Sequence, residues 1–143
     1  MIYLDASVVV AALANEPSSP SIRAWLDQQA DGDICASGWT AVETASALSV
    51  KCRIGALSAQ QLHQALRSLD VLLDMNWAII GVAMDDFAEA RFWTGQSQLG
   101  LRGGDALHLM IARRNDLILA TLDKKLTQIA AQLSVPCAEV PVA

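Results

Sequence analysis

Four acidic residues stand where the surrounding sequence does not fully account for a charge: Asp5, Glu43, Asp105 and Asp123. Asp5 follows the apolar segment 2–4 and precedes a second apolar run. Its carboxylate must therefore reach solvent or find a partner, because burial of an unpaired charge is costly. It could belong to a functional site. Alternatively, Asp5 or Ser7 could cap the following helix by accepting from its first backbone amides.

The other three acids have a similar structural alternative. Glu43 completes Thr40-x-x-Glu43, a capping-box pattern in which the glutamate side chain accepts from the backbone amide of the cap residue. Asp105 follows two glycines at an expected helix start, where the helix dipole favours a negative charge. Asp123 precedes the last long helix and could cap it. Each acid taken alone is therefore compatible with capping or with function.

The chain alternates short apolar strands with helices, which predicts a parallel sheet covered on both faces. We expect strands at 2–4, 33–37, 77–82 and 117–121, and a short last strand at 137–140. We expect helices at 8–13, 20–30, 40–54, 58–73, 85–96 and 105–114, and a final one striped by Leu126, Ile129, Ala130 and Leu133. The predicted fold is α/β, a single domain over residues 1–143 with a parallel sheet of four to five strands.

Two of the acids fall on the edge of this sheet where binding sites form. Ligands of open parallel sheets bind beyond the carboxyl ends of the strands. Asp5 directly follows the first expected strand, and Asp123 lies just past the fourth. We therefore expect both carboxylates at the ligand-binding edge.

Composition is typical of one globular domain. The 143 residues are 53% hydrophobic and 17% charged, which excludes a disordered chain and provides an ordinary, mainly aliphatic core. No apolar run approaches the 18 or so residues of a membrane span. The first residues lack a basic segment and reach an acid at Asp5, so we expect no signal peptide.

Cysteines and charge narrow the class of function. Cys35, Cys52 and Cys137 form no Cys-x-x-Cys pair, so we expect neither a disulfide framework nor a zinc site, and a cytoplasmic location. The formal net charge of −5 argues against binding nucleic acid by charge alone. Of 15 acids and 10 bases, removing the four acids above leaves 11 against 10. The surface elsewhere is therefore nearly neutral.

The order and context of the four acids are more specific than any one of them. The sequence resembles the PIN-domain ribonuclease family, and in particular the small VapC-type toxins of bacterial toxin–antitoxin pairs. The resemblance rests on Leu4-Asp5-Ala6-Ser7, Thr40-Ala41-Val42-Glu43 with Ala47-Leu48, Gly104-Asp105-Ala106-Leu107-His108-Leu109, and Leu119-Ala120-Thr121-Leu122-Asp123-Lys124-Lys125-Leu126. It covers nearly the whole chain. The departures are Ala6, where the family often has a hydroxyl residue, and Met110, where it often has a small one.

The resemblance implies that Asp5, Glu43, Asp105 and Asp123 converge on one or two divalent cations in a PIN-like domain. Carboxylates about 5 Å apart repel by roughly 3 kcal/mol per pair at an effective dielectric near 20, so such a cluster needs protons or a cation. Oxygen ligands without Cys or His favour magnesium or manganese. Asp5 and Asp105 are the expected principal ligands, and Glu43 and Asp123 would hold a second ion or water.

Two hydroxyl residues complete the predicted site. Similarity to the family implies that Ser7 and Thr121 orient the acids or water through hydrogen bonds. Simple turn capping is the structural alternative for both. His108, three positions after Asp105, lies on the same helix face. It could act as a general base, but we expect a packed or hydrogen-bonded histidine.

The resemblance further implies a metal-dependent endoribonuclease that acts as the toxin of a type II toxin–antitoxin pair and hydrolyses RNA phosphodiester bonds. A cognate antitoxin is then expected near helices 20–30 and 58–73, with a basic residue at the acidic cleft. Similar toxins commonly form homodimers. We expect the interface on the helix at 85–96, with Phe92 and Trp93, and on the helix after Asp105, although each aromatic could equally belong to the core.

Two alternatives belong to other classes of function. A PIN-like domain could use its acids to hold a metal or a partner's arginine without cleavage, as a binding module for RNA or protein. A phosphate-accepting receiver domain shares the parallel α/β layout, but it usually has paired acids after the first strand. Only Asp5 stands there in this sequence, which argues against a receiver domain.

Overall fold

A computed structural model describes residues 1–142 of the chain and has the predicted α/β architecture. The strands are β1 (Ile2–Leu4), β2 (Ile34–Ser37), β3 (Ala78–Ile80) and β4 (Ile118–Ala120). They form a parallel sheet with the order β3-β2-β1-β4. Tyr3 of β1 pairs with Cys35 on one side and with Leu119 on the other, so β1 is a central strand. The four-stranded parallel sheet confirms the predicted fold class.

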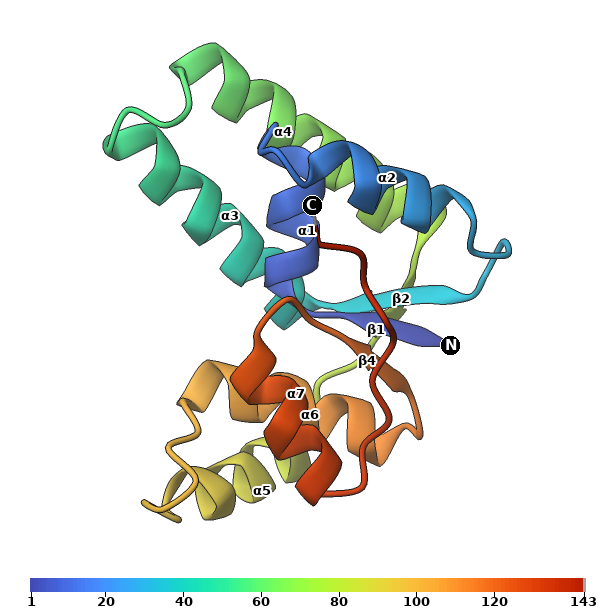
Figure 1. Cartoon of the computed structure of the whole chain (residues 1–143), viewed down its shortest axis with the longest axis vertical. Coiled ribbons are helices and arrows are strands. Elements are labelled where there is room, and N and C mark those ends of the chain that lie inside the picture. Colours follow the sequence, from blue (N-terminus) through green and yellow to red (C-terminus); the bar gives the residue numbers. More distant parts are fainter. Residues whose placement is uncertain (143) are drawn as a thin grey trace.

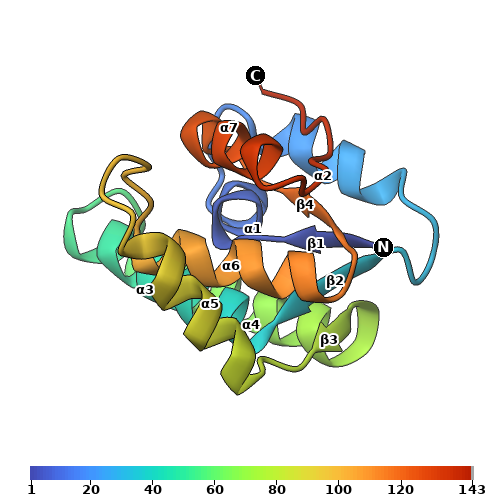
Figure 2. The ribbon, with the colours of Figure 1, turned by 90° about the horizontal axis from the view of Figure 1, so that it is seen from below.

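Helices cover both faces of this sheet, as the alternation of elements predicts (Figure 1). Within residues 1–142 they are α1 (Ala6–Leu13), α2 (Ser19–Asp27), α3 (Gly38–Arg53), α4 (Ala59–Val71), α5 (Met84–Thr94), α6 (Gly103–Arg114) and α7 (Lys124–Gln132). A π-helical turn, Leu72–Asn76, continues α4. In Figure 1, α1 to α4 lie on one side of the sheet and α5 to α7 on the other; Figure 2 shows α6 packed along the sheet with α5 outside it.

Side-chain alternation along β1 explains the two-sided core. Successive residues of a strand point to opposite faces. Tyr3 accordingly packs with residues of α6 and α7, whereas Leu4 packs with Val8 of α1 and Ile22 of α2. All four side chains are fully buried. A third cluster between α1, α3 and α4 extends the core away from the sheet.

Two expectations from the sequence are wrong. The segment at 137–140 is not a strand: Leu119 and Cys137 form a single bridge, after which Ala138 and Val140 pack against the apolar cluster on the α2 face. The helix after Asp105 is not a surface for a second copy of the chain. Every residue from Ala106 to Ala112 is buried, because α6 lies between the sheet and α5.

The carboxyl ends of the strands meet at one edge of the sheet, and each leads into a helix. β1 leads through Asp5 into α1, β2 leads through its last residue, Ser37, into α3, and β4 leads through Thr121 and Asp123 into α7. This edge is where the predicted site residues gather. No helix within residues 1–142 is both long enough and apolar enough to cross a membrane.

Candidate functional site

Asp5 lies at the end of β1 and caps α1. Its Oδ1 accepts from the backbone N–H of Ser7 (2.9 Å) and Val8 (3.4 Å) and from the Ser7 hydroxyl (2.5 Å). Ser7 Oγ in turn accepts from the backbone N–H of Leu122 (2.9 Å), which ties α1 to the loop before α7. The capping interpretation of Asp5 is therefore correct, and Ser7 orients the carboxylate.

The pKa of Asp5 is raised above its ordinary value, chiefly because burial disfavours the charged form. Hydrogen bonds from the Ser7 and Thr121 hydroxyls oppose this shift. The side chain is only 4% exposed and has no cationic partner within the described residues. Asp5 is thus a buried acid that helix capping stabilises only in part.

Asp105 lies in the first turn of α6, near enough to the other three acids for their charges to act on it. Burial raises its pKa first, and the charges of Asp123, Glu43 and Asp5 raise it further. The Asp105 carboxylate accepts no hydrogen bond among the residues that the structure describes. With Asp123 it borders a small cavity of about 60 Å³ between the loop before α6 and the start of α7. The four predicted acids therefore lie within electrostatic reach of one another.

Asp123 caps α7, as its position in the sequence suggested. Its Oδ1 accepts from the backbone N–H of Lys125 (2.8 Å) and Leu126 (3.2 Å). Thr121 Oγ1 accepts from the backbone N–H of Asp123 (3.1 Å). Thr121 therefore orders the turn that carries Asp123.

The capping-box interpretation of Glu43 is wrong. The box of α3 lies one turn earlier, where Ser37 Oγ accepts from Thr40 N and Thr40 Oγ1 accepts from Ser37 N (3.2 Å each). Ser37 ends β2 and caps the helix directly, so α3 begins at Gly38 and Glu43 lies beyond its first turn. Glu43 Oε2 instead pairs with His108 Nε2 at 2.6 Å.

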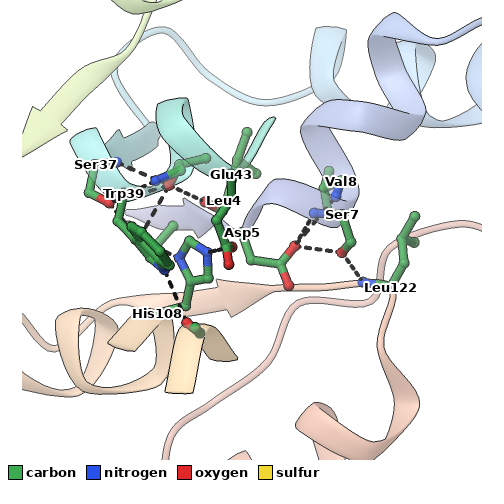
Figure 3. A network of polar contacts seen from close by, with 12 residues as sticks. Leu4, Asp5, Ser7, Val8, Ser37, Trp39, Glu43, His108 and Leu122 are labelled. Atoms are coloured by element: carbon green, nitrogen blue, oxygen red, sulfur yellow. Dashed lines mark hydrogen bonds and ion pairs between the residues drawn. The ribbon is translucent and has the colours of Figure 1, made fainter. Parts of the chain in front are cut away.

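His108 belongs to a buried polar network below the acids (Figure 3). Its side chain is 1% exposed, and its Nδ1 lies 2.8 Å from the Tyr3 hydroxyl. That hydroxyl also contacts Ser37 Oγ (2.8 Å) and Thr40 Oγ1 (3.3 Å). The expectation of a hydrogen-bonded histidine is confirmed. Sequence reasoning did not find the roles of Tyr3 and Ser37, because nothing in the linear pattern places them beside His108.

The chemistry of the donor set fits a hard divalent cation. The acids supply oxygen ligands of the kind that Mg²⁺ and Mn²⁺ prefer. Burial, followed by the charges of the other three acids, raises the pKa of Asp105. Within residues 1–142, however, no group of three or more His, Cys, Asp and Glu side chains is already arranged to hold an ion. A cation would have to draw the carboxylates closer together. Asp5 is the most deeply buried of them, Glu43 and Asp105 are partly buried, and Asp123 is exposed.

The PIN domain family model matches residues 2–132, and the chain belongs to this family. No curated protein matches the sequence. Several solved structures share the fold. VapC20 of Mycobacterium tuberculosis, a toxin that cleaves the sarcin–ricin loop, aligns with a TM-score of 0.72 and 15% identity over 90% of this chain and 95% of that one.

Two further structures have similar coverage. VapBC2 of Rickettsia felis, bound to a DNA fragment from its promoter, has a TM-score of 0.71 and 22% identity over 96% of this chain and 98% of that one. FitAcB of Neisseria gonorrhoeae has a TM-score of 0.70 and 21% identity over 97% of each chain. At these identities the likeness establishes the fold. Nuclease activity is typical of the family to which the chain belongs.

Proposed function

We propose that the chain is a metal-dependent endoribonuclease, the toxin of a type II toxin–antitoxin pair. The observation that carries the proposal is the position of Asp105, whose pKa is raised first by burial and then by the charges of three carboxylates from separate segments. Asp5 and Asp123 cap helices and Glu43 pairs with His108. The Asp105 carboxylate has no such contact within residues 1–142, and it lies among like charges at the ligand-binding edge of the sheet, where they repel it. Carboxylates at this edge offer the oxygen ligands that a hard divalent cation prefers, which supports the proposal.

The proposed roles follow from the position of each side chain. Asp5 and Asp105 are the principal ligands of Mg²⁺ or Mn²⁺, and Glu43 and Asp123 hold a second ion or water. Ser7 and Thr121 orient the Asp5 carboxylate through their hydroxyls. When bound, the cation would neutralise the acids and stabilise the negative charge that develops on the phosphate.

The proposed protein partner is a cognate antitoxin. A groove of about 240 Å³ runs between α1, α2 and α4, the region where we expect the antitoxin segment. Apolar side chains such as Leu13 and Leu57 line it together with Arg23 and Asn15. An arginine of the antitoxin at the acidic site would pair with the carboxylates and compete with the cation. We also propose a homodimer, with exposed apolar residues of α5 at its interface.

An RNA cleavage assay with and without Mg²⁺ or Mn²⁺ tests this function. We expect cation-dependent cleavage by the parent and none by Asp5→Asn or Asp105→Asn, with metal affinity lost in parallel. Asp85→Asn, an exposed acid on α5, is the matched control and should cleave like the parent. Cation binding without cleavage would favour the alternative of a non-catalytic binding module. Parental cleavage by Asp105→Asn would contradict the assigned site.

A further inference from the structure

Two neighbours hold the Glu43 carboxylate in place. Its Oε2 lies 2.6 Å from Nε2 of the buried His108. Its Oε1 lies against Gly104, where a Cβ atom would overlap it. The Gly104 carbonyl accepts from the indole N–H of Trp39 (3.1 Å), so the backbone on this side is also fixed. A partly exposed glutamate would ordinarily sample several rotamers, but this one is confined.

The hydrogen-bonding pattern of His108 shows how its ring is oriented. The Glu43 carboxylate is an acceptor, so Nε2 of His108 carries the proton and donates. Nδ1 lies 2.8 Å from the Tyr3 hydroxyl; it accepts from this hydroxyl when the imidazole is neutral and donates to it when both ring nitrogens carry a proton. Ser37 and Thr40 hold the Tyr3 hydroxyl from the other side. A continuous chain of polar contacts therefore runs from central strand β1 to an acid of the proposed site.

We propose that His108 and Tyr3 are positioning residues, with Tyr3 orienting the imidazole and the imidazole holding Glu43 toward the other acids. One consequence of this inference rests on the proposed function: the contribution of Glu43 to cation binding depends on His108. We call the contacts from Tyr3 through His108 to Glu43 the relay. In metal sites, residues that orient a ligand by a hydrogen bond matter for binding, and removal of such a partner lowers metal affinity about 10- to 100-fold. The hydrogen bonds themselves are present in the structure without a cation.

Two substitutions of His108 test its contact with Glu43 separately from its contact with Tyr3. The amide nitrogen of Gln can take the place of Nε2, whereas Asn reaches only the place of Nδ1. His108→Gln therefore keeps a donor for Glu43, and His108→Asn keeps only the contact with Tyr3. By titration calorimetry with Mn²⁺ on the full chain, we expect His108→Asn to bind about tenfold more weakly. His108→Gln should bind nearly as tightly as the parent.

A double-mutant comparison shows whether His108 acts through Glu43. We expect Glu43→Gln to weaken Mn²⁺ binding, and His108→Asn to add no further loss in that background. An equal loss in both backgrounds would overturn the proposal, as would parental affinity in His108→Asn. His63, exposed on α4, supplies the control His63→Asn, which should change nothing. Tyr3→Phe, which keeps the ring in the core, should weaken binding less than His108→Asn and is the variant to use if the latter does not fold.

Nuclear magnetic resonance of the imidazole nitrogens in the metal-free protein tests the relay independently of the proposed function. Glu43→Gln should shift the His108 Nε2 resonance, and Tyr3→Phe should shift Nδ1. Absence of both shifts would overturn the relay. If the resonances shift but the parent binds no Mn²⁺, the proposed function fails while the positioning of Glu43 by His108 stands.

Discussion

Asp105 and Asp5 are the two acids of the site whose charged form is disfavoured in the folded protein. The pKa of each is raised above the ordinary aspartate value of 3.8, by burial first and, for Asp105, by three like charges. Between 3.8 and the raised pKa, the folded state binds more protons than the unfolded state. The free energy of unfolding therefore falls as pH rises through that window.

Removal of one charge should stabilise the metal-free protein. We expect Asp105→Asn to raise Tm at neutral pH by about 3 °C, which corresponds to roughly 1 kcal/mol for a chain of this size. The variant should also lose less stability than the parent as pH rises above 3.8. Calorimetry in a chelating buffer measures both effects. In a buffer without chelator, added Mn²⁺ should raise the Tm of the parent but not that of the variant. A lower Tm for Asp105→Asn would show that Asp105 stabilises the fold.

Among the secondary-structure elements, the first turn of α6 must leave space for the Glu43 side chain. Gly103 and Gly104 are adjacent in its first turn, but their surroundings differ. A Cβ on Gly104 would overlap Glu43 Oε1 and lie 3.4 Å from Trp39 Cζ2, whereas a Cβ on Gly103 would meet no atom within 4 Å. Glycine at 104 thus gives Glu43 its place beside α6.

These glycines provide a matched test. Alanine favours a helix by up to about 1 kcal/mol over glycine, so Gly103→Ala should be neutral or slightly stabilising and fully active. Gly104→Ala should displace Glu43 and lower cleavage by tenfold or more, since misplacement by about 1 Å can cost 100-fold in rate. Cleavage rates and Tm of both variants check this. Equal activity of the two would show that the position of Glu43 is unimportant.

Helix α5 is joined to α6 by an ion pair between the buried Asp86 and the exposed Arg114. Asp86, 1% exposed, accepts from Arg114 Nε (2.7 Å) and Nη2 (2.9 Å), and from the backbone N–H of Ala83 (2.8 Å). Arg114 also donates to the Gly81 carbonyl (2.7 Å). The Asp86 carboxylate therefore satisfies a backbone amide at the start of α5 and links this helix to the end of α6.

Truncation of the Asp86 side chain should weaken the attachment of α5 to α6. Asp86→Ala removes both the partner of Arg114 and the acceptor for a backbone amide, and we expect a loss of about 2–3 kcal/mol in the free energy of unfolding. Urea denaturation measures it. The exposed neighbour Asp85 provides the control Asp85→Ala, which should change stability by less than about 0.5 kcal/mol. A result for Asp86→Ala no larger than for its neighbour would contradict this assignment.

For the whole molecule, the remaining apolar surface suggests how copies of the chain associate. Met84, Phe87 and Phe92 of α5 are each at least half exposed. Trp93 instead packs partly against the core, and its ring meets Phe92 edge-on at 5.0 Å between centroids. The core alternative thus applies to Trp93. Phe92 remains the candidate for the proposed homodimer.

Sedimentation at micromolar concentration without antitoxin checks this surface. We expect the parent to sediment as a dimer and Phe92→Glu as a monomer, because a charge in an apolar interface is costly. Ile54, 73% exposed at the end of α3, provides the control Ile54→Glu, which should remain dimeric. A monomeric parent would defeat the dimer without affecting the nuclease proposal, since each chain carries all four acids.

The sequence alone determined the alternation of strands and helices and the parallel sheet, because these depend on local apolar patterns and helix-stop residues. It also placed Asp5 and Asp123 at the carboxyl edge, since that follows from strand order along the chain.

Only the tertiary structure decided the surroundings of Glu43. The local pattern with Thr40 suggested a cap, but Ser37 takes that role because β2 ends there. The contact of Glu43 with His108 joins residues 65 positions apart. It exists because the tertiary fold brings α3 beside the first half of α6, where Trp39 also donates to the Gly104 carbonyl, and no local pattern records this.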